Sequence, residues 1–218
     1  MINSNDEEIR HLVWDWNGTL LDDLDLSISI INELLAEHQL PTVDKAQYLE
    51  VFDFPVIDYY RRLGFDFDRV SFEVVGAEFI RRYELRRTEA PLHQSVQSTL
   101  QTLFDRGFSQ SILSAYRQDS LESFLAHFGI RDYFDDIIGS DNVYAHGKIE
   151  QGRAWMRERG ADPETTLLIG DTRHDLEVAN AMNCHCLLIA NGHHPRHRLT
   201  SLGVPVVNTL PEALAWIT

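Results

Sequence analysis

The chain has 218 residues, a length that suits one domain or a domain with a smaller insertion. Apolar residues make up 44% of it, which is enough to bury a sizeable core and excludes global disorder. The formal net charge of -15 disfavours nucleic acid and anionic membranes as partners, so a site for an anionic substrate needs cationic side chains of its own.

The first ten residues and the two cysteines indicate a cytoplasmic protein. The opening stretch is polar and acidic and does not resemble a signal peptide, and no apolar run approaches the roughly 20 residues of a membrane span. Only His185 separates Cys184 from Cys186, and strand positions this close rarely form a disulfide. We therefore expect reduced thiols. A metal role for this Cys-His-Cys triplet lacks a second pair of ligands at suitable spacing.

The N-terminal part of the chain combines one strand with a long helical stretch. Residues 11–15 (HLVWD) read as a buried strand. After it, apolar residues recur at helical spacing: Leu24, Ile28, Ile31 and Leu35. Pro41 is expected to close that helix. Further helical patterns cover three ranges: 43–52, 56–65 and 69–87. Residues 22–88 are therefore expected to be all helix.

Strands and helices alternate in the rest of the chain. Strands are expected at five ranges: 108–114, 134–140, 165–171, 184–190 and 204–208. Helices are expected at five others: 95–107, 119–130, 149–160, 174–183 and 210–217. This alternation predicts right-handed crossovers and a parallel sheet covered on both faces, that is, a doubly wound, Rossmann-like α/β fold. We expect residues 1–21 and 89–218 to form this α/β core domain and residues 22–88 to form an inserted, all-helical domain.

Polar side chains follow several strands of the predicted sheet. Asp15 follows the first strand, Ser114 the second, and Asp171 the fourth, with Asp175 near the start of the next helix; Lys148 lies a few residues past the third strand. Ligands of such sheets bind beyond the carboxyl ends of the strands. Three converging carboxylates with no sulfur or imidazole ligand indicate Mg²⁺.

These residue types are typical of phosphoryl transfer, in which positioning and charge neutralisation supply most of the rate. Asp15 is a candidate nucleophile that would form an aspartyl-phosphate. Lys148 offers a point charge to a phosphate oxygen or to that aspartate. The Ser114 hydroxyl and nearby backbone N–H groups, such as that of Ala115, are candidate ligands of the remaining phosphate oxygens.

The order of these motifs resembles that of the haloacid dehalogenase superfamily over nearly the whole chain. "DWNGT" resembles its first motif, Ser114 its second, Lys148 its third and "GDTRHD" its fourth. The helical insertion is similar to the cap of the phosphoglycolate phosphatase-like branch, and so is the stretch "HFGIRDYFDDIIGSDN". The resemblance implies that Asp15 is both nucleophile and metal ligand, that the metal also contacts the residue 17 carbonyl and Asp171, and that Asp175 binds it through water or as an outer acceptor. It further implies that Ser114 and Lys148 hold the phosphate and that Thr19 orients the loop.

Asn17 departs from the family pattern, Asp-x-Asp-Gly-Thr. In the family's phosphatases the second aspartate protonates the leaving oxygen and then activates water. An amide can do neither, and losing such help typically lowers a rate by roughly 10²–10⁴. We therefore expect leaving groups that need no proton to be turned over best. His174, between two motif aspartates, is either an alternative proton donor or an exposed first-turn histidine.

The sequence leaves two interpretations open for several further residues. Phe52 and Phe54, in "FDFP", either recognise the substrate, as the resemblance implies for this cap loop, or are packing residues. His193, His194 and His197 are expected in a polar loop rather than in a metal site. We expect Lys45 to be solvated rather than to form a Schiff base. We expect the arginines of the insertion to form ion pairs or solvated faces.

Together these features predict a Mg²⁺-dependent phosphatase of a small phosphorylated metabolite, acting as a monomer or homodimer. Two alternatives remain open because of Asn17. One is a catalytically weak or inactive protein that keeps the Mg²⁺ and phosphate sites. The other is a hydrolase of another bond, such as carbon–phosphorus; a carbon–halogen substrate ranks last because it would not need the metal carboxylates.

Overall fold

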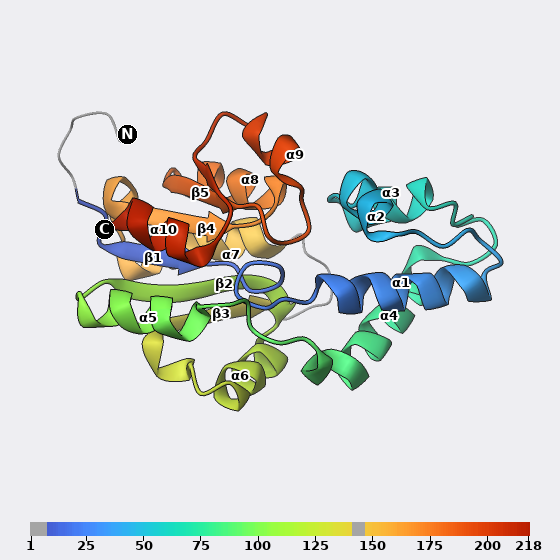
Figure 1. The fold of residues 1–218 in the computed structure, drawn as a ribbon, viewed down its shortest axis with the longest axis horizontal. Coiled ribbons are helices and arrows are strands. Elements are labelled where there is room, and N and C mark those ends of the chain that lie inside the picture. The colour runs from blue at the N-terminus through green and yellow to red at the C-terminus, as the bar shows by residue number, and fades with distance from the viewer. Residues whose placement is uncertain (1–7, 141–146) are drawn as a thin grey trace.

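A computed structural model describes residues 8–140 and 147–218 (Figure 1). Residues 1–7 of the expected core segment lie outside the described residues. So do residues 141–146, which include Asp141 and Asn142 of the quoted "GSDN". Within the described residues no helix is long and apolar enough to cross a membrane.

The described residues form one six-stranded parallel sheet. Its strands are β1 (His11–Trp14), β2 (Ser109–Arg117), β3 (Asp136–Ser140), β4 (Thr166–Gly170), β5 (His185–Ile189) and β6 (Val206–Val207). They lie in the order β3-β2-β1-β4-β5-β6, and each neighbouring pair is parallel. β1 lies inside the sheet, between β2 and β4, so the residue that follows it emerges at the middle of one sheet edge. The predicted doubly wound α/β fold is confirmed.

Helices cover both faces of this sheet (Figure 1). On one face lie α5 (Val96–Asp105), α6 (Gln118–His127) and α10 (Leu210–Ile217); on the other lie α7 (Lys148–Arg159), α8 (Arg173–Met182) and α9 (Arg196–Thr200). Side chains alternate between the two faces along each strand. In β1, Leu12 and Trp14 pack in the first cluster and Val13 in the second. This alternation explains why β1 is apolar at every position of its buried part.

Four helices follow β1 and lie beyond one end of the sheet, at the right of Figure 1. They are α1 (Leu24–Glu37), α2 (Lys45–Val51), α3 (Val56–Arg62) and α4 (Phe72–Arg86), and they bury an apolar cluster of their own. The two segments that connect them to the sheet run side by side, with the Asp22 N–H donating to the Pro91 carbonyl and the His93 N–H to the Leu20 carbonyl. We call α1 to α4 the cap. The division into a core of residues 1–21 and 89–218 and a cap of residues 22–88 stays a prediction.

Three local expectations differ from the structure. The first helix ends at Glu37 rather than near Pro41, because Gln39 has a left-handed φ of 59° that stops the helical hydrogen bonding. β2 continues to Arg117, three residues beyond the expected end at Ser114, with an irregular register between Leu113 and Arg117. The five-residue helix α9 was not expected at all, since it is too short to show a helical period.

Both cysteines are unpaired thiols, as predicted. Cys186 is buried against the second face of the sheet, and burial raises the pKa of the Cys184 thiol to about 12. Burial also raises the pKa of the Cys186 thiol, so both thiols carry their proton at neutral pH.

Candidate active site

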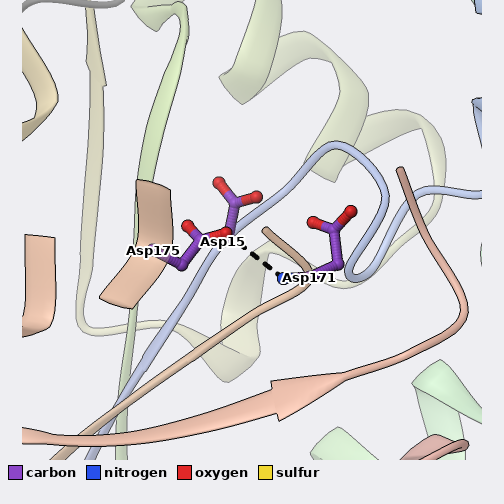
Figure 2. Close-up of side chains that lie close together, drawn as sticks. All are labelled: Asp15, Asp171 and Asp175. Carbon is purple, nitrogen blue, oxygen red and sulfur yellow. Dashed lines mark hydrogen bonds between the residues drawn. The ribbon is translucent and has the colours of Figure 1, made fainter. Parts of the chain in front are cut away.

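Three carboxylates meet at the edge of the sheet where β1 and β4 end (Figure 2). Asp15 follows β1, Asp171 follows β4, and Asp175 lies in the first turn of α8. One oxygen of each lies within 4.8 Å of the others, and the described residues contain no other such group of three acidic, imidazole or thiol side chains. The parallel register places the ends of β1 and β4 side by side, so the sequence prediction that these aspartates converge is confirmed.

Lys148 joins two of these carboxylates from the start of α7. Its Nζ lies 2.6 Å from Asp15 Oδ1 and 2.6 Å from Asp175 Oδ1, and its side chain is 4% exposed. Burial lowers the pKa of the lysine, but the two carboxylates outweigh burial and raise it above its ordinary value. Lys148 is therefore a buried cation held against the candidate nucleophile.

Both carboxylate oxygens of Asp175 have hydrogen-bond partners within the protein. Its Oδ2 accepts from the Asp171 N–H (3.2 Å), the Thr172 N–H (3.0 Å) and the Thr172 hydroxyl (2.7 Å), while Oδ1 contacts Lys148. Burial raises the pKa of Asp175, but Lys148 and these bonds hold it below its ordinary value.. An ionised Asp175 thus keeps the end of β4 and the start of α8 together.

Burial and neighbouring carboxylates disfavour the ionised forms of Asp15 and Asp171. Burial is the main reason that the pKa of Asp15 rises to about 6 and that of Asp171 to about 8. Asp171 accepts hydrogen bonds from the Thr19 hydroxyl at 3.0 Å and the His193 N–H at 2.6 Å. A Cβ on Gly18, whose φ is +75°, would lie 2.4 Å from Asp171 Oδ2, so the loop can approach the carboxylate only because residue 18 has no side chain.

The donor set fits a hard divalent cation. Its side-chain ligands are carboxylate oxygens alone, and no sulfur or imidazole nitrogen belongs to the group. The buried cations at the site are Lys148 and a protonated His193. Four buried carboxylates lie beside them: Asp15, Asp23, Asp171 and Asp175. When all four carboxylates are ionised, these charges leave an excess of two negative charges, which one divalent cation would neutralise.

Ser114 and Ala115 lie on the neighbouring strand at the same edge of the sheet. Trp14 pairs with Ile112, so residue 114 lies beside the end of β1. Ser114 is inside β2 rather than after it, which corrects the expected strand end, and its hydroxyl accepts from the Tyr116 N–H at 3.1 Å. Ser114 is buried and Ala115 half-buried. Their predicted phosphate contacts stay predictions.

Asn17 uses its side chain as a hydrogen-bond donor. Its Nδ2 donates to Asp23 Oδ2 at 2.9 Å and to the hydroxyl of Tyr83, a cap residue of α4, at 2.7 Å. Asp23 also accepts from the Gly18 N–H and from the Tyr83 hydroxyl, and its Oδ1 lies 3.1 Å from His193 Nε2. An amide at position 17 is therefore matched to a carboxylate at position 23.

No sequence signal predicts the network around Asp23, since its members are spread between residues 17 and 193. His193 and His194 lie in the loop between β5 and α9, as predicted, but their side chains are only 7% and 1% exposed. His197 lies in helix α9 rather than in that loop, and its side chain is 64% exposed. Burial lowers the pKa of His193, but Asp23 and the other nearby carboxylates outweigh it and raise the pKa to about 9. Its Nδ1 lies 3.0 Å from the hydroxyl of Tyr48 in the cap.

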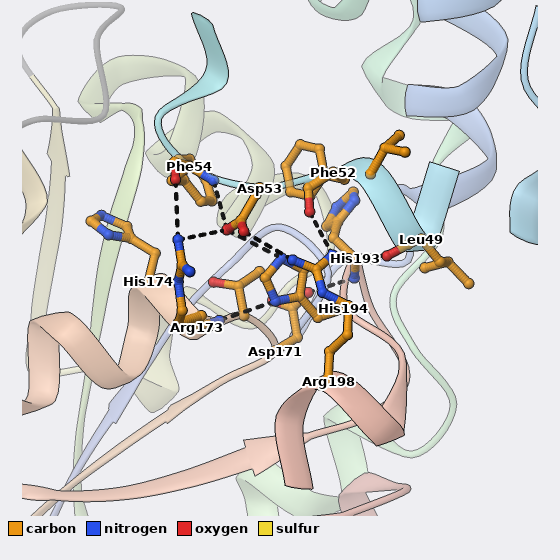
Figure 3. Close-up of polar contacts among 12 residues, drawn as sticks. Leu49, Phe52, Asp53, Phe54, Asp171, Arg173, His174, His193, His194 and Arg198 are labelled. Atoms are coloured by element: carbon orange, nitrogen blue, oxygen red, sulfur yellow. Dashed lines mark hydrogen bonds and ion pairs between the residues drawn. The ribbon is translucent and has the colours of Figure 1, made fainter. Parts of the chain in front are cut away.

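A second group of charges joins the cap loop to the core (Figure 3). Asp53 of the cap is buried, with Arg198 at 2.9 Å, Arg173 at 3.2 Å and His194 Nε2 at 3.8 Å. Arg198 also donates to the carbonyls of Leu49 and Phe52, at the C-terminal end of α2. These contacts explain how α9, which the sequence did not predict, contributes to the site region.

Two phenylalanines of the cap loop and His174 were the remaining candidates for substrate binding or proton donation. Phe52 packs on Tyr48 and on His193, whereas the Phe54 ring lies 4.8 Å from His174. The His174 side chain is only 13% exposed, so the alternative prediction of an exposed first-turn histidine is wrong. Its buried Nε2 has no hydrogen-bond partner among the described residues. A substrate role for Phe54 and a proton-donor role for His174 stay predictions.

The other cationic side chains of the cap behave as expected. Lys45 is 58% exposed and pairs with Asp25. The following arginines of the cap form ion pairs with cap acids: Arg61, Arg81, Arg82, Arg86 and Arg87.

Comparisons with known proteins agree with this fold. The model of the haloacid dehalogenase-like hydrolases matches residues 12–189. Pyrophosphatase PpaX of Halalkalibacterium halodurans is 26% identical over 170 residues, which cover 78% of each chain. A phosphoglycolate phosphatase of Haemophilus influenzae is 22% identical over 219 residues, covering 94% of this chain and 93% of that protein. The solved structure of a haloacid dehalogenase-like family hydrolase from Streptococcus pneumoniae has a TM-score of 0.83 at 20% identity, covering 96% of this chain and 99% of that one.

Proposed function

The chain belongs to the haloacid dehalogenase-like hydrolases, and from this premise we propose that it is a Mg²⁺-dependent phosphatase of a small phosphorylated metabolite. One observation supports the proposal most strongly. The Asp15 carboxylate lies beside two further carboxylates and is held at 2.6 Å by the buried Lys148 ammonium. This arrangement offers a nucleophile, a cation site and a fixed positive charge within one buried space.

In the proposed reaction, Asp15 attacks the phosphorus atom and the bond from phosphorus to the leaving oxygen breaks. Mg²⁺, held by Asp15, Asp171 and the Asn17 carbonyl, with Asp175 binding it through water or as an outer acceptor, would neutralise charge on the phosphoryl oxygens. Lys148, the Ser114 hydroxyl and the backbone at Ala115 hold those oxygens in place. Water then hydrolyses the aspartyl-phosphate and regenerates Asp15.

The role of Asn17 narrows the substrate class. Both hydrogens of its amide are engaged by Asp23 and Tyr83, and an amide has no acidic proton to give. A departing alkoxide therefore receives no proton from position 17. Of the activities named for the two relatives above, hydrolysis of pyrophosphate releases phosphate, a better leaving group than the alkoxide of phosphoglycolate. We accordingly propose phosphoanhydrides and acyl phosphates as better substrates than alkyl phosphates.

A panel of substrates assayed with Mg²⁺ tests this function. We expect turnover of pyrophosphate, acetyl phosphate or p-nitrophenyl phosphate, slow turnover of phosphoglycolate and sugar phosphates, and no turnover after addition of a chelator. The exposed Asp25→Asn variant serves as the control for Asp15→Asn, which should be inactive. Full activity in excess chelator, or in Asp15→Asn, would rule out the proposed mechanism.

A second function is favoured by Asn17 alone, namely Mg²⁺-dependent binding of a phosphorylated ligand without turnover. In that case the whole panel is inactive, yet phosphate stabilises the protein against heating when Mg²⁺ is present. A carbon–phosphorus hydrolase that forms a Schiff base is disfavoured, since the lysine of the cap, Lys45, is exposed and paired with Asp25.

A further inference from the structure

Asp23 is a buried carboxylate that accepts hydrogen bonds from separate parts of the molecule. Its side chain is 3% exposed. Oδ1 accepts from the Gly18 N–H at 2.9 Å and lies 3.1 Å from His193 Nε2; Oδ2 accepts from Asn17 Nδ2 at 2.9 Å and from the Tyr83 hydroxyl at 2.8 Å. These donors belong to the loop after β1, the loop after β5 and the cap helix α4. Such a saturated acceptor holds all three segments in one arrangement.

The bond to Gly18 sets the direction of a candidate metal ligand. The Gly18 N–H and the Asn17 carbonyl belong to one planar trans peptide, so they point in opposite directions. The N–H is shared between Asp23 Oδ1 and the Leu21 carbonyl, each at 2.9 Å, so the Asn17 carbonyl points away from both acceptors. The Asn17 carbonyl accepts no hydrogen bond from any described residue, which leaves its oxygen available to a cation.

The side chain of Asn17 fits the same arrangement. Its Nδ2 donates its two hydrogens to Asp23 and to Tyr83. The amide thus ties the residue whose carbonyl is the candidate ligand both to the carboxylate and to the cap. A carboxylate at position 17 would offer Asp23 no hydrogen unless it carried a proton, so the donor character of Asn17 has a structural reason.

His193 provides a second link from Asp23 to the carboxylate group and the cap. Its backbone N–H donates to Asp171 Oδ2 at 2.6 Å, while its ring contacts Asp23 on one side and the Tyr48 hydroxyl on the other. Two cap tyrosines therefore contact the network, Tyr83 directly and Tyr48 through the imidazole. A displacement of the cap would break hydrogen bonds of the group that holds the 17–18 peptide.

We propose that Asp23 is a positioning residue that orients the Asn17–Gly18 peptide toward the bound cation and links that peptide to the position of the cap. This inference rests on the proposed Mg²⁺ site and deepens it. Residues that orient metal ligands typically change metal affinity by about 10–100-fold when they are replaced. Asp23 would thus affect Mg²⁺ binding without touching the cation or the substrate.

The test measures Mg²⁺ affinity without any substrate, from the rise in melting temperature of the full chain with Mg²⁺ concentration. Asp23→Asn should weaken Mg²⁺ binding about 10-fold or more, because its amide meets the amide of Asn17. The exchange Asn17→Asp with Asp23→Asn restores one donor and one acceptor at this contact and should recover most of the affinity. The matched control Asp25→Asn, at an exposed position two residues away, should bind Mg²⁺ as the wild type does.

Tyr83→Phe supplies a milder variant, since it removes one hydroxyl and should weaken Mg²⁺ binding less than Asp23→Asn. A kinetic readout separates positioning from chemistry: in Asp23→Asn the Mg²⁺ concentration for half-maximal kcat should rise, while kcat at saturating Mg²⁺ should stay near the wild-type value.

Wild-type Mg²⁺ affinity in a folded Asp23→Asn protein overturns the inference and leaves the proposed function intact. If Asp23→Asn does not fold, unchanged affinity in Tyr83→Phe decides the matter in the same way. A wild-type protein whose melting temperature does not respond to Mg²⁺ overturns both the inference and the proposed function.

Discussion

Replacing Asn17 by aspartate places two carboxylates where the structure has an amide and a carboxylate. The contacting atoms are Asn17 Nδ2 and Asp23 Oδ2, 2.9 Å apart, and the Asp23 side chain is 3% exposed. Two unit charges at that distance repel by about 6 kcal/mol at an effective dielectric constant of about 20. Asp23 keeps the charge, because Gly18, Tyr83 and His193 still contact it. The new aspartate therefore takes up a proton when the chain folds.

The free energy of this proton uptake depends on pH in a defined direction. Holding a proton on an aspartyl group whose ordinary pKa is about 3.9 costs about 4 kcal/mol at pH 7 and about 1.5 kcal/mol at pH 5. At pH 7 this is less than the repulsion, so protonation is the favoured outcome. The folded variant binds one more proton than its unfolded chain, so its stability falls as pH rises above about 4. We expect Asn17→Asp to lose about 1.4 kcal/mol per pH unit between pH 5 and pH 7 relative to the wild type.

Urea unfolding of the Mg²⁺-free protein at pH 5, 6 and 7 measures this loss. The double variant Asn17→Asp, Asp23→Asn is the matched control. It keeps one carboxylate at the contact, so its stability relative to the wild type should not fall with pH.

The protonated aspartate of the single variant is also a general acid. The Asn17→Asp variant should therefore raise turnover of alkyl phosphates by about 10-fold or more, with a smaller gain for p-nitrophenyl phosphate. A destabilisation that does not change with pH, or an equal slope in the double variant, would refute the reasoning.

Three further results are expected. Asp15→Asn should abolish turnover and the Mg²⁺-dependent binding of beryllofluoride while keeping the fold, and retained activity in a standard phosphate-release assay would contradict its role as nucleophile. Lys148→Met should lower kcat by about 10²–10³ at saturating Mg²⁺, the usual effect of removing one preorganised donor, and an unchanged kcat would show that the ammonium is not needed. Burial, helped by the Arg198 cation, lowers the pKa of His194 to about 4, so neutral His194 contributes up to about 3 kcal/mol of stability that is present above pH 6.5 and lost as pH falls toward 4. In urea titrations His194→Asn should reduce the loss between pH 7 and pH 4, whereas the exposed His197→Asn should not; equal slopes in both variants would count against this assignment.

The fold and the carboxylate group could be read from the sequence because both depend on short-range patterns. Short apolar stretches identified the strands, and apolar residues at helical spacing identified the helices between them. A parallel sheet brings the carboxyl ends of its strands to one edge. Asp15 and Asp171 follow neighbouring strands, so their convergence needed no knowledge of side-chain packing. The boundaries were less accurate, as at Ser114, because a register irregularity in β2 has no local sequence signature.

The network of Asp23 could not be read in this way. Asp23 looks like one of several acidic residues at the start of a helix, and His193 and His194 look like members of a polar loop. Contacts with the cap make the difference, since Tyr83 donates to Asp23, Tyr48 contacts His193 and Asp53 lies near His194. The sequence alone determined which chemical groups stand at the strand ends. Only the tertiary structure decided which buried charges and donors surround them, because hydrogen bonds and desolvation depend on distances of about 3 Å between residues far apart in the chain, such as Tyr83 and His193, which lie 60 and 170 positions from Asp23.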